Sequence, residues 1–273
     1  GQVCLLSNPN KQRYAWACVN SPAHTKTPMT LDAYFVLAGL AALLVGLSKG
    51  GLPTVGMLAV PLLSLFMSPV KAAVLLLPIY IISDVVSVWL YRKNFSASNL
   101  KILIPAGVLG VFIGWLTASF TSDSAVKLMI GFMGVGFCLN TWLRKTPQDK
   151  QPVNSKKGWF WGTVAGFTSF ISHAGGPPFQ IYVLPQRLPK IQFAGTATLL
   201  FAVINAAKIL PYQLLQPYSY DDLMRAADLI PFALVGTVLG AYITKKIADA
   251  WFYRLVQAGL FAVSIKLIAD VVL

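Results

Sequence analysis

The chain has 273 residues, of which 56% are hydrophobic and only 11% are charged. Because about a quarter of the residues in soluble domains are charged, this composition excludes an ordinary soluble protein and indicates a membrane protein. The net charge of +13 is expected to come from loop lysines and arginines that set membrane orientation, so nucleic-acid binding is not expected. All nine acidic residues are aspartates, which excludes glutamate-based chemistry such as that of H-E-x-x-H metalloproteases.

Residues 1–28 form a polar leader that ends immediately before Met29. The leader lacks the apolar core of a signal peptide. We therefore expect Met29 to be the natural start and the leader to be an extension that is not native. The three cysteines match no metal or redox spacing, and we expect neither a metal site nor a cofactor.

Ten apolar segments follow the leader in chain order. They cover residues 31–47, 55–67, 70–91, 100–120, 125–143, 158–171, 178–184, 191–214, 223–244 and 250–273. The second and seventh segments are short, and the seventh cannot cross a hydrocarbon core about 30 Å thick at about 1.5 Å per residue. We expect each of these two segments to form one half of a helix–break–helix unit with the segment before it.

The two halves of the chain resemble one another. The basic linker 144–157 separates a first transmembrane repeat, 29–143, from a second, 158–273. The sequence "LSKGGLP" at 47–53 aligns with "ISHAGGP" at 171–177, and "LIPAGVLGVFIG" at 103–114 aligns with "LIPFALVGTVLG" at 229–240. Five segments are an odd number, so the second repeat must enter the membrane from the opposite side. The pattern predicts an all-α polytopic membrane protein with two inverted-topology repeats of about five helical segments each, whose broken or re-entrant helices meet near the midplane.

The distribution of basic residues predicts the orientation in the membrane. If the linker is cytoplasmic, the cytoplasmic loops contain thirteen basic residues: Arg92, Lys93, Lys101, Arg144, Lys145, Lys150, Lys156, Lys157, Arg187, Lys190, Lys245, Lys246 and Arg254. After Met29, the opposite loops contain three: Lys71, Lys127 and Arg225. The positive-inside rule then places both termini outside the cytoplasm, in a bacterial-type cytoplasmic (inner) membrane.

The two aligned breaks predict a substrate site. Broken helices at matching positions of an inverted repeat are typical of the binding sites of secondary transporters, because irregular backbone at membrane depth needs protein or water to satisfy it. Glycines permit each break, a proline suits the first turn of the next half-helix, and the N-terminus of that half-helix attracts anions. The predicted substrate-binding residues are Ser48, Lys49, Gly50, Gly51, Pro53, Thr54, Ser172, His173, Gly175, Gly176, Pro177 and Pro178. No catalytic residue is predicted.

Several of these residues have a second, purely structural interpretation. The glycines can serve close helix packing, Lys49 can extend to the membrane interface, and His173 can be a packing residue or a proton-coupled element. Asp84, Asn205 and Lys208 lie within apolar segments and are candidates for the pathway or for ion coupling. Asp84 aligns with Asn205, and we expect Asp84 and Lys208 to form a buried ion pair, as a structural clamp or as part of the pathway.

The sequences "GLSKGGLPTVGMLAVPLL" and "ISHAGGPPFQIYVLPQRL", together with the "AGTATLLFAVINAAK" helix, resemble the TauE/SafE (TSUP) family of sulfite exporters over residues 31–273. The resemblance implies ion-coupled secondary transport of sulfite, sulfoacetate or another small sulfur-containing or organic anion. The second repeat has "SHAGGP" where the first has "SKGGLP", so the two halves of the site are not chemically equivalent.

Two other classes of function remain as alternatives. One is an intramembrane enzyme acting on lipid or peptide, but the adjacent Ser172 and His173 point about 100° apart on a helix and do not form a nucleophile–base pair. The other is a cation-coupled antiporter, which usually has several carboxylates at the midplane, whereas only Asp84 qualifies here. Either a proton or a sodium ion can be the coupling partner. The expected partners are a small anion and membrane lipid.

Overall fold

The computed structural model describes residues 31–53, 55–64, 66–67, 69–118, 120–143 and 150–272. The leader 1–28, Thr54 and residues 144–149 of the linker lie outside these ranges. Within them, all regular secondary structure is helical. In the first half, the helices are α2 (Leu31–Lys49), η2 (Val55–Leu58), α3 (Ala59–Leu63), α4 (Pro69–Tyr91), α5 (Ala97–Thr117) and α6 (Asp123–Leu143). In the second half, they are α7 (Ser155–Ser172), α8 (Gly176–Val183), η3 (Leu184–Gln186), α9 (Lys190–Leu215), α10 (Tyr220–Lys246) and α11 (Asp249–Val272).

Six of the described helices are long and apolar enough to cross a membrane: α4, α5, α6, α9, α10 and α11. Each of them provides a mainly apolar stretch of about 20 residues or more, which is the length that crossing a hydrocarbon core requires. The prediction of an all-helical, multi-pass membrane protein is confirmed.

Two helices end early, and each is followed by a short one. α2 ends at Lys49, and Gly51 then adopts a φ of +119°, which glycine tolerates far better than other residues. α7 ends at Ser172, and His173 caps it in the left-handed conformation with a φ of 52°. α8 begins three residues later with proline in its first turn, where a missing amide hydrogen does no harm. α3 lies against α2, and α8 lies against α7.

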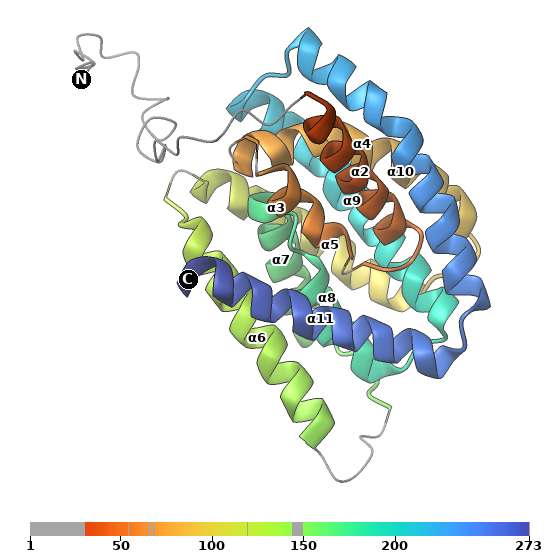
Figure 1. The fold of residues 1–273 in the computed structure, drawn as a ribbon. Coiled ribbons are helices and arrows are strands. Elements are labelled where there is room, and N and C mark those ends of the chain that lie inside the picture. Colours follow the sequence, from red (N-terminus) through yellow and green to blue (C-terminus); the bar gives the residue numbers. More distant parts are fainter. Residues whose placement is uncertain are drawn as a thin grey trace.

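The helices pack in pairs through small residues. α2 packs along α10 and α5 packs along α7, while α4 and α9 lie together and α6 pairs with α11 at one side of the molecule (Figure 1). The closest of these helix contacts are possible only because glycine has no side chain. A Cβ atom on Gly46 of α2 would lie 2.0 Å from the Ala233 carbonyl oxygen of α10, and one on Gly166 of α7 would lie 2.0 Å from the Gly107 carbonyl oxygen of α5. This close packing brings the ends of α2 and α7 to the central pair α4 and α9.

Candidate functional site

A small cavity lies between the end of α2, the end of α7 and the central helices α4 and α9. It is lined by Ser48, Lys49, Pro53, Gly56, Met57, Tyr80, Ser169, His173, Gly176, Ala197, Thr198, Phe201 and Asn205. Its volume is about 40 Å³. Because one water molecule needs about 10–15 Å³ on the same measure, the cavity accommodates a few waters or one small ion.

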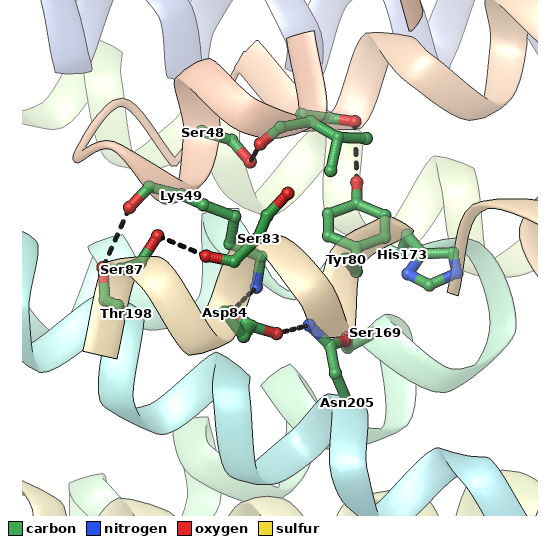
Figure 2. A network of polar contacts seen from close by, with 12 residues as sticks. Ser48, Lys49, Tyr80, Ser83, Asp84, Ser87, Ser169, His173, Thr198 and Asn205 are labelled. Carbon is green, nitrogen blue, oxygen red and sulfur yellow. Dashed lines mark hydrogen bonds and ion pairs between the residues drawn. The ribbon is translucent and has the colours of Figure 1, made fainter. Parts of the chain in front are cut away.

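Lys49 is held by an ion pair at this cavity. Its ammonium nitrogen lies 2.7 Å from Asp84 Oδ1, and both side chains are only 6% exposed. Asp84 Oδ2 accepts a 2.7 Å hydrogen bond from Asn205 Nδ2 (Figure 2). The ammonium also lies 5.1 Å from the centre of the Tyr80 ring and 5.9 Å from that of Phe201, so both ring faces add cation–π attraction. Lys49 therefore lies inside the protein and does not extend to an interface.

Lys208 occupies a second polar centre, next to the end of α7. Its ammonium donates to Ser169 O at 3.0 Å and to Ser169 Oγ at 3.1 Å, and it lies 3.1 Å from His173 Nδ1. The expected ion pair between Asp84 and Lys208 is wrong, because Asp84 pairs with Lys49. The two lysines reach different acceptors because they enter the centre from different helices, α2 and α9.

His173 is fixed on several sides. Its Nε2 lies 3.1 Å from the Ala73 carbonyl oxygen, and its ring stacks on Tyr80 with 4.8 Å between centroids and 13° between planes. The Tyr212 ring meets it edge-on at 6.1 Å. A carbonyl oxygen only accepts hydrogen bonds, so Nε2 must carry a hydrogen. His173 is thus a well-packed residue that also lines the cavity.

The structure brings only some of the predicted substrate-binding residues to the cavity. Those that line it are Ser48, Lys49, Pro53, His173, Gly176 and, from the pathway candidates, Asn205. The residues that do not line it are Gly50, Gly51, Ser172, Gly175, Pro177 and Pro178, together with Asp84 and Lys208, which contact residues that line the cavity. The role of these residues in substrate binding stays a prediction.

The residues of the breaks that lie away from the cavity have structural contacts. A Cβ atom on Gly50 would lie 2.6 Å from the Ala241 backbone nitrogen of α10, so Gly50 serves close packing. The hydroxyl of Ser172 donates to the Thr168 carbonyl oxygen of its own helix, and Ser48, although it lines the cavity, likewise donates to the Val45 carbonyl oxygen. Pro177 and Pro178 have no amide hydrogen, so the first turn of α8 offers an anion fewer donors than a helix N-terminus usually does.

Four residues that line the cavity were not predicted from the sequence: Tyr80, Ser169, Thr198 and Phe201. For the three that lie on α4 and α9, a signal was present in the sequence. Tyr80 precedes Asp84 by four residues, so both lie on one face of α4. On α9, Thr198 and Phe201 continue the helical spacing of Asn205 and Lys208 toward the N-terminus. A search for polar residues at helical spacing in these otherwise apolar helices would have identified the faces of α4 and α9 that point to the cavity.

Gln180 of α8 is a further unexpected residue. Its side chain is completely buried, and neither its amide oxygen nor its amide nitrogen has a hydrogen-bond partner among the described residues. The amide nitrogen would lie 3.6 Å from a Cβ atom on Gly176, which lines the cavity. A buried amide without partners is costly, and such groups often mark a bound water or ligand.

The family model described as sulfite exporter TauE/SafE matches residues 37–267. The chain belongs to this family. Neither the comparison with curated proteins nor that with solved structures gives a match. TauE/SafE proteins are membrane transporters, so the family assignment excludes the alternative of an intramembrane enzyme and agrees with the helical, membrane-spanning architecture.

Proposed function

We propose that this TauE/SafE protein is a secondary transporter of small sulfur-containing or organic anions, such as sulfite or sulfoacetate, and that it works as an exporter by alternating access. The observation that supports this best is the cavity between the two helix breaks. It is small and is lined by both halves of the chain. Among the described residues, the buried charged side chains that line it or contact its lining are two lysines and one carboxylate, together with His173. Such a site favours a small anion over a cation.

We propose further that residues 29–143 and 158–273 are inverted repeats related by a pseudo-twofold axis. The helix contacts support this, because they persist when the halves are exchanged. α2 packs on α10 as α7 packs on α5, and α4 packs on α10 as α9 packs on α5. The pairs α4–α9 and α6–α11 each join equivalent helices. In inverted repeats, movement of one repeat against the other exposes a central site to alternate sides of the membrane.

Two tyrosine hydrogen bonds supply the register of the proposed repeat. Tyr91 at the end of α4 donates to the Gly50 carbonyl at 2.6 Å, and Tyr212 on α9 donates to the Phe170 carbonyl at 2.6 Å. These contacts pair Gly50 with Phe170. The sequence motif pairs Gly50 with Ala174, four residues later. α7 therefore continues about one helical turn further than α2 before it breaks.

The alignment given by the two tyrosines assigns Lys49 a different counterpart in the second repeat than the motif alignment does. The motif aligns Lys49 with His173, whereas the tyrosine contacts align it with Ser169. In the first repeat, a lysine from the broken helix meets Asp84 of α4. In the second, Ser169 of the broken helix meets Lys208 of α9. Asp84 and Asn205, which align with each other, are hydrogen bonded across the centre, as expected of residues near a pseudo-twofold axis.

The proposed transport cycle uses these side chains as follows. An ammonium has three donors, and Lys49 uses one of them on Asp84, so it can also donate to an anion in the cavity. Buried ion pairs release a partner only if that partner gains another contact, so the anion and Asp84 compete for Lys49. We propose that a proton or a sodium ion is the coupling partner. We also place the linker in the cytoplasm and both termini outside, in a bacterial-type inner membrane.

Anion flux in proteoliposomes tests the proposal. The native protein is expected to move sulfite or sulfoacetate, and Lys49→Met is expected to reduce that flux at least about tenfold, since Lys49 supplies a charge-assisted hydrogen bond to the substrate. Lys266→Met is the matched control, because Lys266 pairs with Asp270 at a partly exposed site and does not line the cavity. Native protein that moves no anion of this class would refute the proposed function.

A further inference from the structure

Four buried side chains decide the charge of the candidate site. Within the described residues, the buried side chains of acidic or basic residues are those of Lys49, Asp84, His173 and Lys208. They belong to four helices or their ends. Lys49 and His173 line the cavity, Asp84 contacts Lys49 (Figure 2), and Lys208 contacts His173. The phenols of Tyr80 and Tyr212, which also face this group, are neutral near pH 7.

The first pair of charges cancels. Lys49 and Asp84 are in direct contact at 2.7 Å and contribute no net charge together. Asn205, the other hydrogen-bond partner of Asp84, is neutral. Any net charge at the cavity must therefore come from Lys208 and His173.

The surroundings of Lys208 favour a charged pair. Three acceptors lie around its nitrogen: Ser169 O, Ser169 Oγ and His173 Nδ1. Three acceptors match the three N–H groups of an ammonium. If Lys208 transfers its proton to Nδ1 of His173, this Nδ1–H donates a hydrogen bond to the neutral Lys208 amine. Nε2 still donates to the Ala73 carbonyl. In both arrangements the pair holds one positive charge.

We propose that the Lys208–His173 pair carries this single charge and that the site consequently selects singly charged anions, such as hydrogen sulfite or a monosulfonate, over doubly charged ones. Of the two substrates named above, this favours sulfite in its singly protonated form over sulfoacetate, which carries two negative charges near neutral pH. This inference rests on the proposed anion transport and adds the charge class of its substrate. One negative charge makes the occupied centre neutral. A dianion leaves one unit of negative charge inside the membrane, where uncompensated charge is strongly disfavoured.

Three ligands of nearly the same tetrahedral shape isolate charge from size: sulfate with two negative charges, methanesulfonate with one, and dimethyl sulfone with none. Calorimetric titration of each ligand into the purified full-length chain in a neutral detergent measures the dissociation constants. We expect methanesulfonate to bind at least about tenfold more tightly than either of the others. Sulfate binding as tight as methanesulfonate binding would overturn the inference and leave anion transport standing. Binding of neither anion would refute the proposed function together with the inference.

Two substitutions shift the charge in opposite directions with little change in shape. Asp84→Asn raises the net charge of the site by one unit. It is expected to strengthen the binding of sulfate relative to that of methanesulfonate at least about tenfold. Lys208→Met lowers it by one and is expected to remove the preference for methanesulfonate over dimethyl sulfone. The same ligand order in both variants as in the native protein would overturn the inference. Because the native protein alone already discriminates sulfate from methanesulfonate, a variant that fails to fold does not remove the test.

Discussion

The ion pair between Lys49 and Asp84 makes a strong prediction about stability. Lys49→Met leaves the Asp84 carboxylate without its ion partner, in a place where both side chains are only 6% exposed. Removing one member of a buried ion pair typically costs about 3–5 kcal/mol, because the other charge remains buried and unpaired. Asp84→Leu is expected to cost a similar amount, because it strands Lys49 and also the amide of Asn205.

The double variant distinguishes ion pairing from simple loss of packing. Lys49→Met with Asp84→Leu removes both charges, and replacement of a buried pair by apolar residues is often neutral or stabilising. The double variant should therefore lose several kcal/mol less free energy of unfolding than the sum of the two single variants. If the substitutions only removed packing contacts independently, the two losses would add.

Thermal unfolding in detergent measures these effects. For a chain of this size, 1 kcal/mol corresponds to a shift of about 2–4 °C, so each single variant should melt about 6–20 °C below the native protein. The double variant should recover most of that loss. Lys266→Met is the control, because it breaks an ion pair whose side chains are 38% and 32% exposed, and exposed pairs contribute at most about 1 kcal/mol. The reasoning would be refuted if the single variants had the melting temperature of the native protein. It would also be refuted if the double variant lost as much as the two single variants together.

Three further predictions test helix packing, the buried amide and the register of the repeat. Gly166→Ala should lower the melting temperature, because its Cβ would lie 2.0 Å from a carbonyl oxygen of α5, whereas Gly136→Ala meets nothing within 4 Å and should gain up to about 1 kcal/mol from helix propensity. Gln180→Met should leave the melting temperature unchanged or raise it, since it removes an amide without partners, and a simultaneous fall in anion flux would show that the amide contacts substrate. Tyr91→Phe and Tyr212→Phe should each cost about 0.5–1.5 kcal/mol in thermal unfolding, and clearly unequal losses would contradict their equivalence.

The sequence predicted the long helices well because their length has one dominant cause. The eighth predicted segment, 191–214, corresponds to α9 (Lys190–Leu215), and the ninth, 223–244, corresponds to α10 (Tyr220–Lys246). A membrane helix must cover a fixed apolar thickness, so composition alone locates it. The segment 55–67 was expected as one apolar element and is instead a 3₁₀ turn followed by the five-residue α3. Where no such thickness has to be crossed, composition does not locate an element's ends.

The candidate site was predicted only in part, because its geometry depends on how helices rotate against one another. The breaks themselves could be read from glycine and proline. The partner of Lys49 could not, since Asp84 and Lys208 both lie within apolar segments and only the rotation of α4 and α9 decides which of them faces α2. The polar stripe on α9, from Thr198 to Lys208, carried that information and becomes readable once its helical spacing is considered.

Under the proposed inverted repeat, the extra turn of α7 gives a physical reason why the two halves are unequal. If both broken helices ended at equivalent points with a lysine, two ammonium groups would meet near the axis and repel each other. In the register proposed above, the position equivalent to Lys49 is Ser169, and the additional turn carries His173 to the Tyr80 ring and to 3.1 Å from Lys208. One half then presents a neutralised pair and the other a positive one. The proposed repeat with this single offset would hold one negative charge at its centre, whereas two identical halves would each present the same charge and require a second anion.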